Sequence, residues 1–166
     1  MLHGVMALCS KSGGLFYSKA FTKNFGLPRA ASSDSHNIAS LIFALQLNAA
    51  SLSPSLPSAE ASEQGAKGGA CLRSVEMHGL RVLFGREGRL LVALFVDPEL
   101  GDSASADLLT DLVASLSHRY ASHIAASDPR TGVRKLPQAL GVVQECLART
   151  ASGLMQELVA HLREGG

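Results

Sequence analysis

Outside the stretches with helical spacing, two short segments are apolar at every position, and they constrain the fold more than any other feature. One runs from Val5 to Cys9 and the other from Leu90 to Val96. Successive side chains of a strand point to opposite faces of a sheet, so a strand is apolar throughout only when both faces are covered. Both segments are too short for a typical buried helix. We therefore expect two central strands of a sheet that carries other layers on both faces.

Three further segments have the composition of strands. Leu15–Phe21 mixes aromatic residues with Ser and Lys after the turn residues Ser10–Gly14, which predicts a hairpin with a half-exposed second strand. Leu72–His78 and Leu80–Gly85 also have strand patterns, and the turn Arg86–Arg89 would join the second of them to the strand beginning at Leu90. The sequence thus predicts a five-stranded antiparallel sheet.

Helical spacing of apolar residues appears in three places. The first helix would begin at the capping residues Ser32–Ser35 and continue to Leu52, the second would begin at Asp102-Ser103, and the last would begin near Pro137. The expected element order is β-β-α-β-β-β-α-α, an α+β fold with helices on both faces of the sheet. We interpret residues 1–166 as one domain, in which the Ser-, Pro- and Gly-rich segment 53–70 is a mobile internal loop.

Composition excludes several classes of protein. Apolar residues make up 46% of the chain and charged residues 17%, so the chain can bury a core and is too hydrophobic to be disordered throughout. The formal net charge of +1 is not that of a typical nucleic-acid-binding domain. No apolar stretch reaches the roughly 20 residues that a membrane-spanning helix needs. With no recognisable signal peptide and no CxxC pair among the three cysteines, we expect a cytoplasmic protein with reduced thiols.

Some polar residues have the spacing of possible catalytic or metal sites, but ordinary structural roles explain them better. Asp107, Asp111 and His118 share one face of the predicted second helix, which is more typical of a solvated surface. His118 and His123 are five residues apart and would not lie side by side on a helix. Cys9 lies in a predicted central strand, where a thiol behaves as a small apolar group.

The remaining candidate motifs are equally weak. Ser12-Gly13-Gly14 lacks the spacing and the following helix of a phosphate-binding loop, and a tight turn explains it. Asp34 and His36 are residue types of a hydrolase triad, but helix capping accounts for them. We expect no catalytic residue, no cofactor and no metal, and hence a protein that is not an enzyme.

The first predicted helix is apolar nearly all round. A stripe that should face the sheet recurs at helical spacing: Ile38, Leu41, Ile42, Leu45, Ala49 and Leu52. Phe43 and Leu47 project away from the Ile38 side of the helix. Either a segment of the same chain or another protein must cover them, and a Ser-, Pro- and Gly-rich loop is a poor hydrophobic cover. Phe43 and Leu47 are therefore the candidate partner-binding residues.

The element order and the strand-turn-strand segment His3–Ser18 resemble the longin (SNARE-like) domains of membrane-trafficking proteins. The resemblance covers nearly the whole chain and implies a non-catalytic interaction platform. It also implies a small subunit that pairs with other proteins through its first helix and a sheet edge. Phe43 and Leu47 would suit that surface. The subfamily stays open.

The resemblance leaves two functions within vesicle transport. The chain would be a subunit of a small-GTPase exchange or tethering complex, or it would be a small subunit of a coat adaptor. Coat small subunits usually have a more charged first helix, which favours the first function. The expected partners are other longin-like or trafficking-complex subunits and a small GTPase, with recruitment to endomembranes through those partners.

A function of another class is also compatible with such a sheet. The chain could be a small-molecule sensor or an enzyme on a PAS- or profilin-like sheet, with a ligand held between the sheet and the helices. A pocket of that kind needs polar groups that converge inside it, whereas the predicted inward faces are nearly all Leu, Val, Ile and Ala.

Overall fold

A computed structural model describes residues 1–22, 34–52, 72–77, 79–127 and 135–164, of which the side chains of 34, 52, 77 and 157–164 are not described. Five strands form one sheet in the order β2-β1-β5-β4-β3, and every neighbouring pair is antiparallel. The strands are β1 Leu2–Cys9, β2 Leu15–Ala20, β3 Ser74–Met77, β4 Leu80–Glu87 and β5 Leu90–Val96. The predicted five-stranded antiparallel sheet is confirmed.

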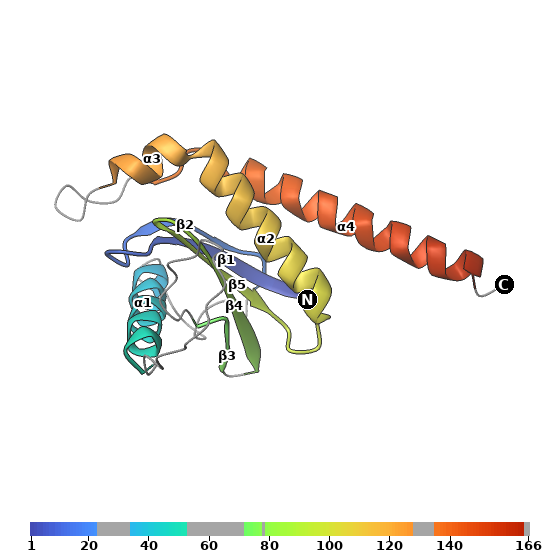
Figure 1. Cartoon of the computed structure of the whole chain (residues 1–166), viewed down its shortest axis with the longest axis horizontal. Helices are drawn as coiled ribbons and strands as arrows, with labels where there is room; N and C mark the ends of the chain where they lie inside the picture. The colour runs from blue at the N-terminus through green and yellow to red at the C-terminus, as the bar shows by residue number, and fades with distance from the viewer. Residues whose placement is uncertain (23–33, 53–71, 78, 128–134, 165–166) are drawn as a thin grey trace, which may run out of the picture.

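The helices cover both faces of this sheet. Helix α1 spans Asp34–Leu52 and lies on one face, whereas α2 (Asp102–Arg119) and α4 (Ala139–Glu164) lie on the other (Figure 1). A short helix, α3, occupies Ala121–Ala126 between α2 and α4. This α3 was not predicted, because six residues cannot display a helical period clearly enough to be recognised. The C-terminal half of α4 extends beyond the sheet (Figure 1).

The apolar segments form the two central strands, as expected. Every residue of β5 is buried, and in β1 all residues from His3 to Cys9 are buried. Alternate residues enter two separate cores. Val5, Val92 and Leu94 pack beneath α2 and α4, while Met6 and Leu91 belong to the core beneath α1. Burial on both faces therefore explains why these two segments carry no polar alternation.

Glycines with positive φ form two of the hairpin turns. Gly13 has a φ of 71° in the turn between β1 and β2, and Gly88 has a φ of 55° between β4 and β5. Only glycine adopts such angles without steric cost. Strand β4 continues through Arg86 and Glu87, which pair with Leu91 and Leu90, so the predicted turn over Arg86–Arg89 is wrong at its first two residues. The longer pairing with β5 extends the strand past the expected end.

Helix boundaries differ from the sequence prediction at one cap. Asp102 is already helical, and Gly101 occupies the N-cap position without any side-chain hydrogen bond. The Asp102-Ser103 cap is therefore wrong. The Asp102 carboxylate instead contacts the Arg81 guanidinium of β4 at 2.5 Å. The predicted loop 53–70 lies outside the described residues.

Gly85 of β4 allows α2 to approach the sheet closely. A Cβ at this position would lie 2.7 Å from Val113 Cγ2 and 3.0 Å from Leu109 Cγ, distances that packed atoms do not tolerate. Val113 is β-branched and cannot easily rotate away. The absence of a side chain at Gly85 thus fixes the spacing between α2 and β4.

We predict that Gly85→Val lowers the free energy of unfolding by about 1–3 kcal/mol, because the new side chain overpacks the α2–β4 contact. Gly141→Ala is the matched control. A Cβ at Gly141 meets no atom within 4 Å, so this variant should be neutral or gain about 0.5 kcal/mol. Urea denaturation measures both values. Equal stability of Gly85→Val and the wild type would contradict the assigned packing.

Candidate functional site

Helix α1 has one side buried against the sheet and one side exposed. Ala39 and Ile42 are each 1% exposed and belong to the core beneath the helix. On the outer side, Leu41 is 48% exposed and Leu47 is 55% exposed. Six residues separate these two leucines, so they lie about 120° apart around the helix, one on each side of the exposed Ala44.

The exposed side of α1 also carries no charge. After His36, no residue from Asn37 to Leu52 is Asp, Glu, Lys, Arg or His. A helix that is exposed to water along its length usually carries charged side chains on the outer face. Depletion of charge is instead typical of the centre of a protein interface. The exposed positions after His36 are Asn37, Ser40, Leu41, Ala44, Leu47, Asn48, Ala50 and Ser51.

The two predicted partner-binding residues lie in different surroundings. Leu47 is exposed, in the position that its spacing suggested. Phe43 is half-buried, and its ring lies against the β1–β2 turn: a Cβ on Gly13 would be 2.7 Å from Phe43 Cγ. Phe43 therefore anchors α1 to the turn as well as bordering the exposed face. Leu41 is the second exposed leucine, so its predicted place on the sheet-facing stripe is wrong. The contact at Gly13 depends on the tertiary fold, so sequence spacing alone could not reveal it.

A side-chain amide holds the second half of α1 beside the start of β3. Gln46 Nε2 donates to the Leu72 carbonyl at 3.1 Å, and the Leu72 N–H donates to Gln46 Oε1 at 3.2 Å. These two bonds place the edge strand β3 next to the same helix. The exposed face of α1 and the β3 edge thus form neighbouring surfaces.

The opposite edge of the sheet is partly occupied. The Phe16 carbonyl of β2 accepts a hydrogen bond of 3.1 Å from the N–H of Leu136, in the segment that precedes α4. Lys19, near the end of β2, is exposed. A backbone contact and a charge both oppose pairing with a further strand. Of the two sheet edges, β3 is therefore the more accessible within the described chain.

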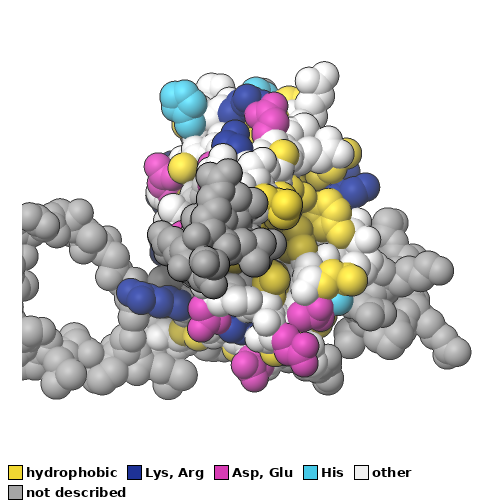
Figure 2. Space-filling view, turned by 90° about the vertical axis from the view of Figure 1, so that its right-hand side faces the viewer, with side chains coloured by type: hydrophobic (Ala, Val, Ile, Leu, Met, Phe, Trp, Pro, Cys, Tyr) yellow, Lys and Arg dark blue, Asp and Glu magenta, His cyan; other side chains and the backbone are white. Residues whose placement is uncertain are grey.

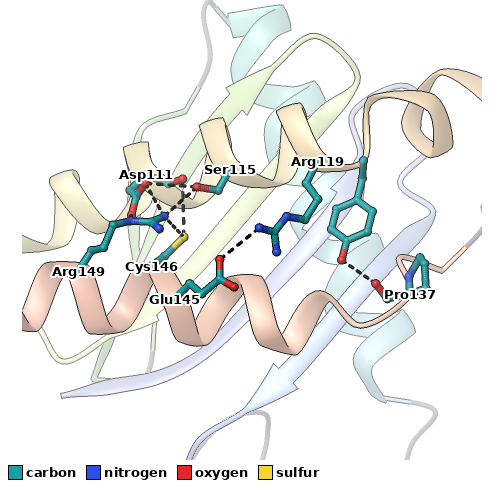
Figure 3. A network of polar contacts seen from close by, with 8 residues as sticks. Asp111, Ser115, Arg119, Pro137, Glu145, Cys146 and Arg149 are labelled. Carbon is teal, nitrogen blue, oxygen red and sulfur yellow. Dashed lines mark hydrogen bonds and ion pairs between the residues drawn. The ribbon is translucent and has the colours of Figure 1, made fainter.

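The polar cluster on α2 is a contact with α4. Arg149 binds Asp111 through two hydrogen bonds, Nε to Oδ2 at 2.9 Å and Nη2 to Oδ1 at 3.0 Å. Ser115 and Cys146 also accept from Arg149, and these side chains point toward one another from the two helices (Figure 3). The prediction that Asp111 lies on a solvated helix face is wrong, because α4 packs along that side of α2.

The other metal or catalytic candidates remain separate from this cluster. Asp107 and His118 are exposed on α2, and His123 on α3 lies edge-on to Tyr120, with ring centroids 5.9 Å apart. Within the described residues, no three His, Cys, Asp or Glu side chains are placed to hold a metal ion. His36 is exposed at the start of α1.

The two cysteines for which the structure gives surroundings are both buried. Burial of Cys9 favours its neutral thiol and by itself would raise the pKa. Hydrogen bonds from the Ser12 side chain and from the backbone at Lys11 and Ser12 favour the thiolate and together outweigh burial, so the pKa of Cys9 is lowered. Burial raises the pKa of Cys146. At 1% and 0% exposure, neither thiol is accessible to a substrate in this conformation.

Other exposed apolar residues belong to parts of the chain outside α1. Met1, Phe21, Leu154 and Met155 are 65%, 37%, 46% and 61% exposed. On the side of the molecule toward which α4 runs, hydrophobic side chains gather in a hollow (Figure 2).

Among the helices in the described ranges, none is both long enough and apolar enough to cross a membrane.

Comparisons with known proteins give a weak likeness among solved structures. No protein-family model matches the chain, and no curated protein matches it. Among structures, the chain is similar to a chain of a homology model of the full-length AP-3 complex in a stretched open conformation. The TM-score is 0.44 with 13% sequence identity, and the alignment covers 95% of this chain and 99% of that chain. A likeness at this level carries no argument about function.

The α2–α4 contact gives a pH-dependence test. Hydrogen bonding and attraction by Arg149 lower the pKa of Asp111 in the folded state. A carboxylate with a lowered folded pKa stabilises the fold above its unfolded pKa of about 3.9, and this stabilisation is lost as the pH falls through the folded value. We predict that the stability advantage of the wild type over Asp111→Asn shrinks between pH 6 and pH 3.

Urea denaturation across this pH range measures the free energy of unfolding of the wild type and of Asp111→Asn. Asp107→Asn is the matched control, because Asp107 is exposed one turn earlier and forms no ion pair with a described residue. The difference in free energy of unfolding between Asp107→Asn and the wild type should change less with pH. An Asp111→Asn difference that stays constant down to pH 3 would contradict the assigned role of Arg149.

Proposed function

We propose that this chain is a non-catalytic, longin-like subunit of a vesicle-trafficking complex, in which α1 docks against another subunit. The observation that carries the proposal is the uncharged outer face of α1, with Leu41 and Leu47 about half exposed in the isolated chain. Together these two leucines expose about the area of one whole leucine, and burying one leucine side chain contributes roughly 1.5–3 kcal/mol.

The sheet supports a platform more than a ligand-binding pocket. The buried polar residues in the described part of the chain are His3, Ser105 and Ser127. His3 bonds to Thr22 and Asp97, while the two serine hydroxyls donate to backbone carbonyls four residues earlier. Because these groups bond within the protein, they are not available to orient a small molecule between sheet and helices. A sensor or enzyme on a PAS- or profilin-like sheet is therefore the less favoured function.

Two trafficking roles fit the same surface. In a small-GTPase exchange or tethering complex, α1 would pair with a second longin-like subunit. In a coat adaptor, α1 and the sheet would seat against a large coat subunit. The lack of charge on α1 favours the first role, because coat small subunits usually have a more charged first helix. In either role the chain would reach endomembranes through its partners and would need no cofactor.

The two classes of function differ in a simple ligand test. A sensor or enzyme would melt at a higher temperature in the presence of its metabolite or nucleotide, because a ligand that binds the native state stabilises it. We expect no shift of the melting temperature in a screen of nucleotides and common metabolites. A reproducible shift would favour the sensor or enzyme.

We predict that Leu41→Asp combined with Leu47→Asp abolishes co-purification of the partner subunit from native cells and leaves the monomer folded. Both side chains are exposed, so the charges cost little in the free chain but would be buried without a counter-ion in the complex. Pull-down with mass spectrometry identifies the partner, and circular dichroism checks the fold. Phe43→Asp is less suitable, because Phe43 also packs on the β1–β2 turn.

Ala148→Asp is the control, since it adds the same charge at an exposed position of α4. It should retain the partner. A second longin-like chain or a small GTPase in the wild-type complex would support the exchange or tethering role, and coat subunits would support the adaptor role. Undiminished recovery of the partner with the double variant would refute docking through α1.

A further inference from the structure

A row of leucines runs along α4, and the chain covers it only in part. Leu140, Leu147 and Leu154 follow one another at intervals of seven residues, so they lie along one line of the helix. Leu140 and Leu147 are half-buried, and Leu147 packs against the core beneath α2 and α4. Leu154 is 46% exposed, and the adjacent Met155 is 61% exposed. The row therefore becomes more exposed toward the end of the helix.

This row lies beside the side of α4 that the chain buries. The buried residues of α4 face the sheet and α2, and they are Ala139, Val142, Val143 and Cys146. At about 100° of rotation per residue, Leu147 and Leu154 lie roughly 70–90° around the helix from the centre of these four positions. The row is thus a separate flank of α4, and packing inside the chain does not explain the leucine at position 154.

The exposed part of the row lies where α4 leaves the body of the protein. The C-terminal half of α4 extends beyond the sheet (Figure 1). All residues from Ala151 to Gln156 are exposed. Figure 2 is viewed from the side toward which this half runs, and hydrophobic side chains gather there in a hollow. A second helix could therefore reach the flank of α4 at Leu154 without meeting the sheet.

The projecting half of α4 is also uncharged around Leu154. From Thr150 to Gln156 the sequence contains no Asp, Glu, Lys, Arg or His. Two identical helices that pair in opposite directions bring the same residues together at their centre, so a charge there would meet its own copy. Like charges that face each other disfavour association. The neutral segment removes this obstacle to pairing between two copies of the chain.

The row is its own complement in an antiparallel pair that is centred between Leu154 and Met155. Leu154 of one copy then opposes Met155 of the second copy. Ala151 and Leu147 oppose positions 158 and 162, where the sequence has leucine. A contact about a two-fold axis requires one surface that complements itself. Because the row meets this requirement, a second copy of the chain is the occupant that it fits.

We propose that two copies of this chain form a dimer in which the C-terminal halves of α4 pair antiparallel through Leu147, Ala151, Leu154 and Met155. The contact spans positions 147–162, about 24 Å of helix at 1.5 Å per residue. An interface of this length is small, so we expect a dissociation constant of roughly 1–100 μM. Since α4 and α1 lie on opposite faces of the sheet, the dimer leaves the α1 face free and does not depend on the proposed function.

Sedimentation velocity of the purified full chain tests the dimer directly. The sedimenting mass should rise from that of a monomer to that of a dimer between about 1 and 200 μM, as the expected dissociation constant requires. A mass that stays at the monomer value at the highest concentration would overturn the proposal, and the row would then be left to a different protein.

Leu154→Glu should raise the dissociation constant of the dimer by at least about tenfold, because two glutamates would be buried close together at the centre of the pair. Gln156→Glu is the matched control. It adds the same charge at an exposed position that lies about 160° around the helix from Leu154, so it should change the dissociation constant by less than about twofold. Equal dissociation constants for Leu154→Glu and the wild type would contradict pairing through this row.

A mixture of two variants tests whether α4 of one copy meets α4 of the other. Leu154→Glu and Leu154→Lys chains in equal amounts should dimerise at least about tenfold more tightly than either variant alone, since opposite charges then meet at the centre of the pair. A mixture that dimerises no more tightly than the separate variants would refute the antiparallel pairing.

The melting temperature of each variant checks that it remains folded. Leu41→Asp with Leu47→Asp should leave the dimer unchanged, and Leu154→Glu should leave co-purification through α1 unchanged, so failure of one proposal is distinguishable from failure of the other. Loss of the dimer on substitution of α1 would overturn its assignment to α4.

Discussion

The burial of β1 and β5 on both faces is the constraint on which the rest of this structure depends. Their side chains enter two separate apolar cores, so the sheet is stable only when each face is covered. Two helices, α2 and α4, share one face and are joined by Asp111 and Arg149. On the other face, α1 is the helix that the structure describes. The two layers therefore differ in what they leave exposed.

This difference between the two layers concerns above all the exposed outer face of α1. A single helix on a sheet buries one stripe and exposes the rest, and charged side chains usually occupy the exposed part. The exposed part of α1 has none after His36 and includes Leu41 and Leu47. On the other face, α2 places charged residues along its outer side and against α4. The contrast between the two layers is the physical basis for assigning α1 to an interface.

The sequence predicts the parts of the fold that depend on periodic burial. The two apolar strands, the hairpin that follows β1 and the apolar character of α1 could be recognised because their patterns repeat over many residues. Leu47 could be identified for the same reason. The predictions on segment 53–70 and on the number of domains stay predictions.

Features that depend on contacts between distant residues could not be predicted. Phe43 packs on the Gly13 turn, and Arg149 reaches Asp111 across 38 positions of sequence. The close approach of α2 to β4 at Gly85 likewise joins residues that are distant in the sequence. None of these produces a periodic signal. Leu41 was placed on the buried stripe because helical spacing alone does not fix which adjacent positions face the sheet.

The central claim is that another protein covers the outer face of α1, and site-specific photo-crosslinking in cells tests it most directly. A photoreactive phenylalanine analogue would replace Leu47 in one version of the chain and the exposed Ala148 of α4 in another. We predict a discrete crosslinked protein from position 47 and none of the same mass from position 148. Crosslinking that is absent at position 47, or identical at both positions, would contradict it.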